Sequence, residues 1–244
     1  MNKEEISIII PARYASTRLP GKPLIKVKDK PIIQWVYERA SKSKFAGSVI
    51  VATDSQEIFD AVKDFGGKVM MTSPEHNSGS DRIAEIVRNN KEIKIAVNVQ
   101  GDEPLISPES IDTAINGLIE HAEADITTLS RVIEEKEEIL NPNIVKVVFD
   151  NSYNALYFSR SPIPHERNAG ESKTYAHIGL YAYRRESLLK MTALEQTNLE
   201  RAESLEQLRA LQNGMKIQVY CVNYKPIGID TEEDLAKFKK IVES

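Results

Sequence analysis

Short apolar runs alternate with amphipathic segments along the first half of the chain. Runs rich in β-branched residues predict four buried strands, at Ile6–Ile10, Ser48–Thr53, Lys68–Met71 and Ile95–Val99. Helical spacing of apolar residues predicts helices between and after them: Pro31–Lys42, a helix opened by an Asp54-x-x-Glu57 capping box, one following Ser73–Arg82, and one opened by Ser107-Pro108-Glu109. Strand and helix in alternation indicate a mostly parallel sheet wound in the Rossmann-like manner.

The pattern changes at Asp125. Segments with a period of two predict antiparallel strands at Asp125–Val132, Val145–Asp150 and Tyr153–Phe158, and a further strand at Tyr175–Tyr183. We then expect one helix at Leu199–Leu211, a strand at Lys216–Asn223 and a terminal helix capped by Thr231-x-x-Asp234. No linker rich in Gly, Ser or Pro precedes Asp125. We therefore expect a single α/β domain, with a mixed, mostly parallel sheet flanked by helices and an antiparallel β elaboration.

Composition narrows the possible partners. The 244 residues carry 32 basic and 36 acidic side chains, a formal net charge of −4, so no basic excess indicates nucleic-acid binding. The single cysteine, Cys221, excludes an intrachain disulfide and a Cys-based zinc cluster, and its apolar alternation predicts a buried strand residue. Neither a signal peptide nor a membrane-spanning run is present, so we expect a cytoplasmic protein without membrane insertion.

The loop after the first predicted strand carries three cations, Arg13, Arg18 and Lys22, among proline and glycine residues that fix its backbone. Ligands of open α/β sheets bind outside the carboxyl ends of the strands, so these cations indicate a polyanion such as a nucleoside triphosphate. The loop is neither a P-loop nor a G-x-G-x-x-G turn. The alternative interpretation is ordinary solvated surface charge.

A second signal follows the fourth predicted strand, at Gln100-Gly101-Asp102-Glu103-Pro104. A carboxylate at the end of a central strand can hold a magnesium ion that bridges triphosphate oxygens, and Asp102 is the candidate. Asp230 comes from a distant segment and would complete a site of hard oxygen ligands. The alternative is a polar surface turn.

Several segments and single residues remain ambiguous from the sequence alone. The stretch Ser78-Gly79-Ser80 opens a helix whose free N–H groups suit an anion or a base edge, or it is simply a capped helix start. His76, in the same loop, pairs with no nucleophile, and we interpret it as a loop residue. His177 has no second metal ligand at suitable spacing, and a lone strand histidine is usually structural. Glu206 and Gln207 interrupt an apolar stripe and could be its polar flank.

Several of these segments resemble one family. PARYASTRLPGKPL in the first loop, Ser78–Arg82, the HxGxY pattern from His177 and LEQLR from Leu205 are similar to the 3-deoxy-manno-octulosonate (Kdo) cytidylyltransferases, along nearly the whole chain. The resemblance implies transfer of CMP from CTP to Kdo with release of pyrophosphate, which activates Kdo for lipopolysaccharide synthesis. It also implies a homodimer, with the nucleotide bound by residues of about 1–124 and 223–244, and the acceptor and partner subunit bound by about 125–222.

The resemblance also implies a role for each matching residue. CTP would be bound by Ala12, Arg13, Lys22, Ser78, Gly79, Arg82 and Gln100, with Arg18 as a weaker candidate. Catalysis would depend on Arg13, Lys22, Asp102 and Asp230, with Mg²⁺ on the two aspartates. The acceptor would be bound by Arg160, His177, Tyr181, Glu206 and Gln207, and Arg160 would take the Kdo carboxylate, since a guanidinium binds a carboxylate through two parallel hydrogen bonds.

Three other functions remain open. A cytidylyltransferase for another acidic sugar, such as sialic acid or an amino-substituted Kdo, would also need Arg160. A catalytically silent nucleotide-binding protein would have no reason to keep Lys22, Asp102 and Asp230 together. A dinucleotide-dependent dehydrogenase is disfavoured because the G-x-G-x-x-G turn is missing.

Overall fold

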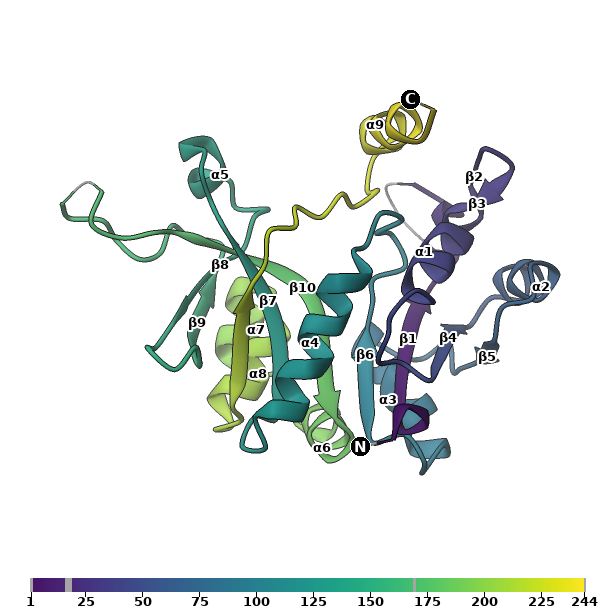
Figure 1. Ribbon diagram of the computed structural model, residues 1–244, viewed down its shortest axis with the longest axis horizontal. Coiled ribbons are helices and arrows are strands. Elements are labelled where there is room, and N and C mark those ends of the chain that lie inside the picture. The colour runs from purple at the N-terminus through teal and green to yellow at the C-terminus, as the bar shows by residue number, and fades with distance from the viewer. Residues whose placement is uncertain (1, 16–18, 169, 244) are drawn as a thin grey trace. The chain divides into compact units, whose positions relative to one another are not determined.

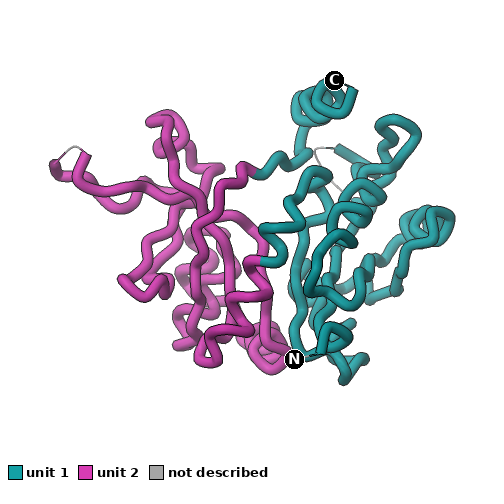
Figure 2. Tube along the Cα trace, in the orientation of Figure 1, with its two compact units in different colours: residues 1–112, 226–244 teal, residues 113–225 magenta. Residues whose placement is uncertain are grey.

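The computed structural model describes residues 2–15, 19–168 and 170–243, so the predicted candidate Arg18 lies outside the described residues. The chain divides into two compact units, residues 1–112 with 226–244 and residues 113–225 (Figure 2). We refer to them as unit 1 and unit 2 and describe each by itself. Within the described residues, no helix combines the length and the apolar run that crossing a bilayer requires.

The sheet of unit 1 is parallel, as predicted (Figure 1). Its strands lie in the order β6-β1-β4-β5, with β1 (Ile6–Ala12), β4 (Ser48–Thr53), β5 (Val69–Met71) and β6 (Ile95–Asn98). The apolar runs explain this arrangement because strands covered on both faces need apolar side chains at every position. Ile8, Ile9 and Ile10 in β1 have no exposed surface.

The helices of unit 1 follow the predicted spacing. They are α1 (Ile32–Ala40), α2 (Gln56–Asp64), α3 (Gly79–Asn89), α9 (Glu232–Glu243) and the first part of α4 (Pro108–Glu120), with the short helices η1 (Lys3–Glu5) and η2 (Lys22–Leu24) and a small hairpin of β2 (Lys26–Val27) and β3 (Lys30–Pro31). In α3, the side chains of Ile83, Ala84 and Val87 are buried against the sheet. Trp35 packs edge-on against Phe238 of α9, which joins the end of the chain to α1.

Two local predictions in unit 1 are wrong. β1 does not end at Ile10 but continues through Pro11 to Ala12. Pairing with β6 stops at Ile9, and beyond it β1 pairs with β4, so the missing N–H of Pro11 costs little there. The N-cap of α2 is Ser55, whose Oγ accepts from the backbone N–H of Ile58, and not Asp54.

Unit 2 has the predicted change to antiparallel pairing. β10 (Tyr175–Arg184) pairs antiparallel with β7 (Ile126–Val132) and β8 (Lys146–Phe149), and β8 forms a hairpin with β9 (Ala155–Ser159). β11 (Ile217–Cys221) lies parallel to β7. The β8–β9 turn is held by the Asp150 carboxylate, which accepts from the backbone N–H groups of Ser152 and Asn154.

The prediction of one helix at Leu199–Leu211 is wrong. The structure has two short helices there, α7 (Asn198–Glu203) and α8 (Gln207–Gln212), besides α5 (Lys136–Leu140) and α6 (Arg185–Ala193) elsewhere in unit 2. Ser204 has a left-handed backbone with φ +51°, which no α-helix contains. Consequently only Leu205 and Leu208 of the expected apolar stripe are buried, and Ala202 is exposed.

The expectation of a buried Cys221 is also wrong. Ile217 and Val219 of β11 are buried, but the burial ends at the last two residues of the strand, and the Cys221 thiol is exposed. Alternation along the sequence predicts which face a side chain lies on, and it does not show where along a strand the covering elements stop.

Candidate active site

Lys22 joins two aspartates that are distant in the sequence. Its ammonium Nζ lies 2.7 Å from Asp102 Oδ2 and 3.1 Å from Asp230 Oδ1. Lys22 opens η2, Asp102 lies in the turn after β6, and Asp230 precedes α9. The backbone N–H of Ile229 donates to the Asp102 carbonyl at 2.9 Å and fixes the second segment against the first. We call these three side chains the Lys22 cluster.

Two glycines allow the backbone approaches around this cluster. Gly21, directly before Lys22, has φ +66°, a conformation that costs glycine nothing. At Gly101, directly before Asp102, a Cβ atom would lie 2.8 Å from the Pro11 carbonyl oxygen of β1. Only glycine therefore lets the Asp102 turn approach the end of β1 this closely.

The electrostatics of the cluster favour a charged ammonium. Burial opposes that charge, but the carboxylates of Asp102 and Asp230 outweigh it and raise the pKa of Lys22 above its usual value. The side chain of Lys22 is 13% exposed, against 31% for Asp102 and 47% for Asp230. Both carboxylates thus retain oxygen surface for other ligands.

The second predicted phosphate ligand, Arg13, is tied to a neighbouring loop. Its guanidinium donates to the carbonyl oxygen of His76 at 2.5 Å. The His76 imidazole in turn contacts the Glu85 carboxylate, which also accepts from the backbone N–H of Ser73 at 2.9 Å. His76 is thus a loop residue, as interpreted from the sequence, and Glu85 is its support. Ala12, next to Arg13, is buried at the end of β1.

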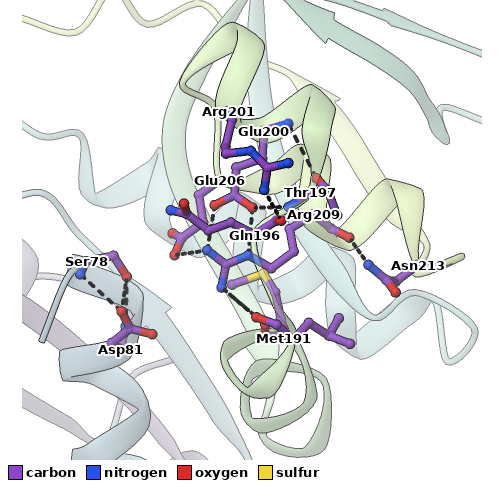
Figure 3. A network of polar contacts seen from close by, with 11 residues as sticks. Ser78, Asp81, Met191, Gln196, Thr197, Glu200, Arg201, Glu206, Arg209 and Asn213 are labelled. Atoms are coloured by element: carbon purple, nitrogen blue, oxygen red, sulfur yellow. Dashed lines mark hydrogen bonds and ion pairs between the residues drawn. The ribbon is translucent and has the colours of Figure 1, made fainter.

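The Ser78–Arg82 segment forms a capped helix start. Ser78 Oγ accepts from the backbone N–H of Asp81 at 3.1 Å, and the Ser78 N–H donates back to the Asp81 carboxylate (Figure 3). Gly79 begins α3. Arg82, one turn further, has no exposed surface; its guanidinium pairs with Asp54 at 2.6 Å and contacts the Thr72 hydroxyl. The Arg82 side chain is therefore fully enclosed. Gln100, which follows β6, is half-buried.

In unit 2, β10 brings His177 and Tyr181 together, with ring centroids 5.4 Å apart. The β-bulge between Ile178 and Tyr181 shifts the register there. His177 Nε2 lies 2.9 Å from the Thr128 hydroxyl, and burial lowers the pKa of this imidazole to about 3, so it is neutral near pH 7. Burial, followed by the charge of Tyr183 and of Glu206, raises the pKa of Tyr181, so its phenol stays protonated.

Glu206 and Gln207 lie at the break between α7 and α8. We call residues 203–207 the α7–α8 junction. Glu206 precedes α8 and lies 3.9 Å from the Arg209 guanidinium, while Gln207 is buried, with an amide Nε2 that has no hydrogen-bond partner among the described residues. Arg160 is attached to the same junction, since its guanidinium donates to the carbonyl oxygens of Glu203 and Ser204.

Comparison with known proteins assigns the chain to a family. The cytidylyltransferase family model matches residues 7–217. The chain is 52% identical to the 3-deoxy-manno-octulosonate cytidylyltransferase of Thermodesulfovibrio yellowstonii, over 95% of this chain and 96% of that protein. It is 48% identical to the enzyme of the same name from Geobacter metallireducens, over 96% of both. The chain belongs to the 3-deoxy-manno-octulosonate cytidylyltransferase family.

Solved structures agree with this family. The fold matches a CMP:2-keto-3-deoxy-manno-octonic acid synthetase complexed with CTP, with a TM-score of 0.94 and 43% identity over 98% of both chains. A cytidylyltransferase from Leptospira borgpetersenii, at 21% identity and a TM-score of 0.64, shares the fold. Family membership and the α/β fold class are thus confirmed, whereas the roles of individual residues stay predictions.

Sequence reasoning missed the residues that support the family motifs. Asp54 holds Arg82, Glu85 holds His76, and Glu203 holds Arg160. Asp54 was considered only as a helix cap, and Glu85 and Glu203 are part of no motif on which the prediction was based. Their only signal in the sequence is an acidic side chain, and each acquires its partner through the fold.

Proposed function

We propose that the protein transfers CMP from CTP to the anomeric hydroxyl of Kdo and releases pyrophosphate. The observation that carries the proposal is the Lys22 cluster, in which one ammonium and two carboxylates meet from segments far apart in the chain. Such an arrangement suits a ligand that brings both negative phosphates and a cation. The relatives with the Kdo cytidylyltransferase name, similar along nearly their whole length, support the same reaction.

The nucleotide would be bound by unit 1. Arg13 and Lys22 offset the charge of the triphosphate, and the backbone around Ala12, Gly79 and Gln100 lines the base and sugar. Ser78 serves by capping α3, whose N-terminal N–H groups then face the ligand. Because Arg82 is fully buried, we assign it a supporting role in holding Asp54 and Thr72, the residues that follow β4 and β5.

Asp102 and Asp230 would hold Mg²⁺. Both carboxylates already converge on one cation, the Lys22 ammonium, and both are partly exposed, which fits a divalent metal that completes its shell with water and phosphate oxygens. Among the described residues no group of three or more His, Cys, Asp or Glu could hold a metal, so water and substrate oxygens would supply the other ligands. When bound, the metal would withdraw charge from the α-phosphate.

The chemistry needs no covalent intermediate. The anomeric oxygen attacks the α-phosphorus in line, the bond to the bridging oxygen of pyrophosphate breaks, and the hydroxyl proton is released. Alignment and charge stabilisation supply most of the rate in such transfers. Lys22 and Arg13 contribute by stabilising the negative charge that develops on the leaving pyrophosphate.

The acceptor would be bound by unit 2. Arg160 takes the carboxylate of Kdo. His177, neutral at pH 7, and Tyr181, with its proton retained, are suited to sugar hydroxyls, and so are Glu206 and Gln207. The buried Gln207 amide, which lacks a partner among the described residues, supports this because a hydroxyl would satisfy it.

We further propose a homodimer through residues of about 125–222. Tyr153 is 53% exposed and Leu156 61% exposed on the β8–β9 hairpin, a surface that a second copy would cover. Sedimentation velocity of the parent and of Leu156→Lys checks this proposal. A parent that sediments as a monomer at micromolar concentration contradicts it.

The test of the function is pyrophosphate release from CTP and Mg²⁺ with Kdo, sialic acid or no sugar. We expect release that requires Kdo and that Asp102→Ala abolishes, while Asp64→Ala, an exposed aspartate on α2, behaves like the parent. Pyrophosphate release with sialic acid and none with Kdo would show that the acceptor is another acidic sugar. Bound CTP without release in any arm would indicate a silent nucleotide-binding protein.

A further inference from the structure

Glu203 is the last residue of α7, where a carboxylate is electrostatically unfavourable. The carbonyl ends of a helix carry partial negative charge and favour a cation instead. Glu203 is compensated by two hydrogen bonds: Oε1 accepts from the Ser159 hydroxyl at 2.6 Å, and Oε2 accepts from the backbone N–H of Arg160 at 2.9 Å. The side chain is thus directed onto the end of β9.

Arg160 returns the contact from the opposite direction. Its Nε donates to the Glu203 carbonyl at 2.7 Å, Nη2 to the Ser204 carbonyl at 3.4 Å, and Nη1 to the Pro142 carbonyl at 3.0 Å. The bonds to Glu203 and Ser204 satisfy carbonyls that the end of α7 leaves open. Together the three bonds use three of the five guanidinium N–H groups, so two remain for a carboxylate.

Lys146 completes the arrangement. Its side chain has no exposed surface, and its ammonium donates to the carbonyls of Asn141, Ile144 and Arg160 at 3.0, 2.6 and 2.6 Å. Burial, and to a smaller extent the charge of Arg160, lowers the pKa of Lys146, and the Glu203 carboxylate acts in the opposite direction. Glu203 is therefore the negative charge that offsets two neighbouring cations.

The position of Glu203 also affects the residue that follows it, Ser204. Ser204 adopts its left-handed conformation directly after Glu203, and this turn ends α7 and places Glu206 and Gln207 at the start of α8. We propose that Glu203 is a positioning residue for acceptor recognition, which fixes Arg160 and the α7–α8 junction in one geometry. The inference rests on the proposed function, because it assigns Glu203 to the acceptor rather than to the nucleotide.

The test is Glu203→Gln, with Glu195→Gln, an exposed glutamate that follows α6, as the matched control. We expect the KM for Kdo to rise about tenfold or more, as for the loss of a hydrogen bond to a charged group, with the KM for CTP within about twofold of the parent. Ser159→Ala, which removes one of the two hydrogen bonds, should shift the KM for Kdo in the same direction by less. Equal shifts in both KM values, or no shift, would overturn the proposal.

Amide hydrogen exchange of the α7–α8 junction gives a readout that needs no substrate. We expect faster exchange of residues 205–208 in Glu203→Gln, and unchanged exchange of the backbone around Lys22. If the parent releases no pyrophosphate with Kdo but the exchange changes as expected, the proposed function fails and the positioning role stands. Unchanged exchange in both Glu203→Gln and Ser159→Ala contradicts the role itself. If Glu203→Gln does not fold, unchanged exchange in Ser159→Ala alone contradicts it.

Discussion

The Lys22 cluster of unit 1 and the Glu200–Arg209 ion pair that flanks the α7–α8 junction of unit 2 differ in how far their ionised side chains are exposed to solvent. The Lys22 cluster keeps its two carboxylates 31% and 47% exposed. On the two sides of the α7–α8 junction, Glu200 of α7 and Arg209 of α8 are 6% and 7% exposed and joined by two hydrogen bonds (Figure 3). Asp102 and Asp230 thus keep solvent-accessible surface, whereas the Glu200 and Arg209 charges are buried and paired with each other.

The largest expected effect concerns the buried Glu200–Arg209 ion pair. Arg209→Met leaves the Glu200 carboxylate buried without its counter-ion, and we expect the free energy of unfolding to fall by about 3–5 kcal/mol. Urea denaturation followed by circular dichroism measures this loss. The double variant Arg209→Met/Glu200→Met should recover most of it.

The matched control is Lys30→Met, which removes a pair whose side chains are both 41% exposed. We expect a loss of no more than about 1 kcal/mol for this exposed pair. Equal destabilisation by Arg209→Met and Lys30→Met would show that burial does not make the Glu200–Arg209 pair more important for stability than an exposed ion pair.

The second effect concerns the partly exposed Lys22 cluster. Lys22→Met removes the cation between Asp102 and Asp230, and we expect pyrophosphate release to slow about 10²–10³-fold, the usual cost of losing one electrostatic contact to the reacting groups. Lys26→Met, an exposed lysine of β2 on the same segment, should keep the parent rate. A Lys22→Met rate within about threefold of the parent would remove Lys22 from the catalytic residues.

The third prediction concerns how the stability of the protein depends on pH through the desolvated His177 imidazole. The pKa of His177 is lowered to about 3 in the folded state, from an ordinary 6.5, so the unfolded chain binds the extra proton more readily. The stabilisation is therefore complete above pH 6.5 and is lost as the pH falls towards 3, by about 2 kcal/mol at pH 5. We expect His177→Gln to lose about 2 kcal/mol less than the parent between pH 7 and pH 5 in urea denaturation.

His121→Gln, at an imidazole whose side chain is 38% exposed, is the control and should follow the parent. Identical pH dependence of stability in His177→Gln and the parent would show that the His177 imidazole is not desolvated.

The smallest effect tests the helix break. Ser204→Gly relieves a left-handed conformation, and we expect the protein to become more stable by about 0.5–1 kcal/mol. Ala202→Gly, inside α7, should instead cost about 0.5–1 kcal/mol. In a continuous helix, Ser204→Gly would lower the free energy of unfolding, as Ala202→Gly does. An increase for Ser204→Gly therefore supports the helix break at this residue. Thermal or urea denaturation of the two variants measures both signs.

The sequence predicted the two regions unequally. The parallel sheet followed from local patterns, and so did the expectation that Asp102 and Asp230 lie together. The pairing of Lys22 with both aspartates was not predicted. The α7–α8 break was not predicted either, because it depends on Arg160 bonding the carbonyls of Glu203 and Ser204 from another part of the chain. The burial of Arg82 likewise depends on Asp54, a long-range pairing that a spacing rule cannot contain.

The discontinuity of unit 1 has a consequence for biosynthesis. Its residues 226–244 leave the ribosome only after the whole of unit 2 has been synthesised. They carry Asp230 and also Phe238, which packs on Trp35. A nascent chain therefore holds Asp102 long before Asp230, and the Lys22 cluster can form only after the whole of unit 2 has been synthesised.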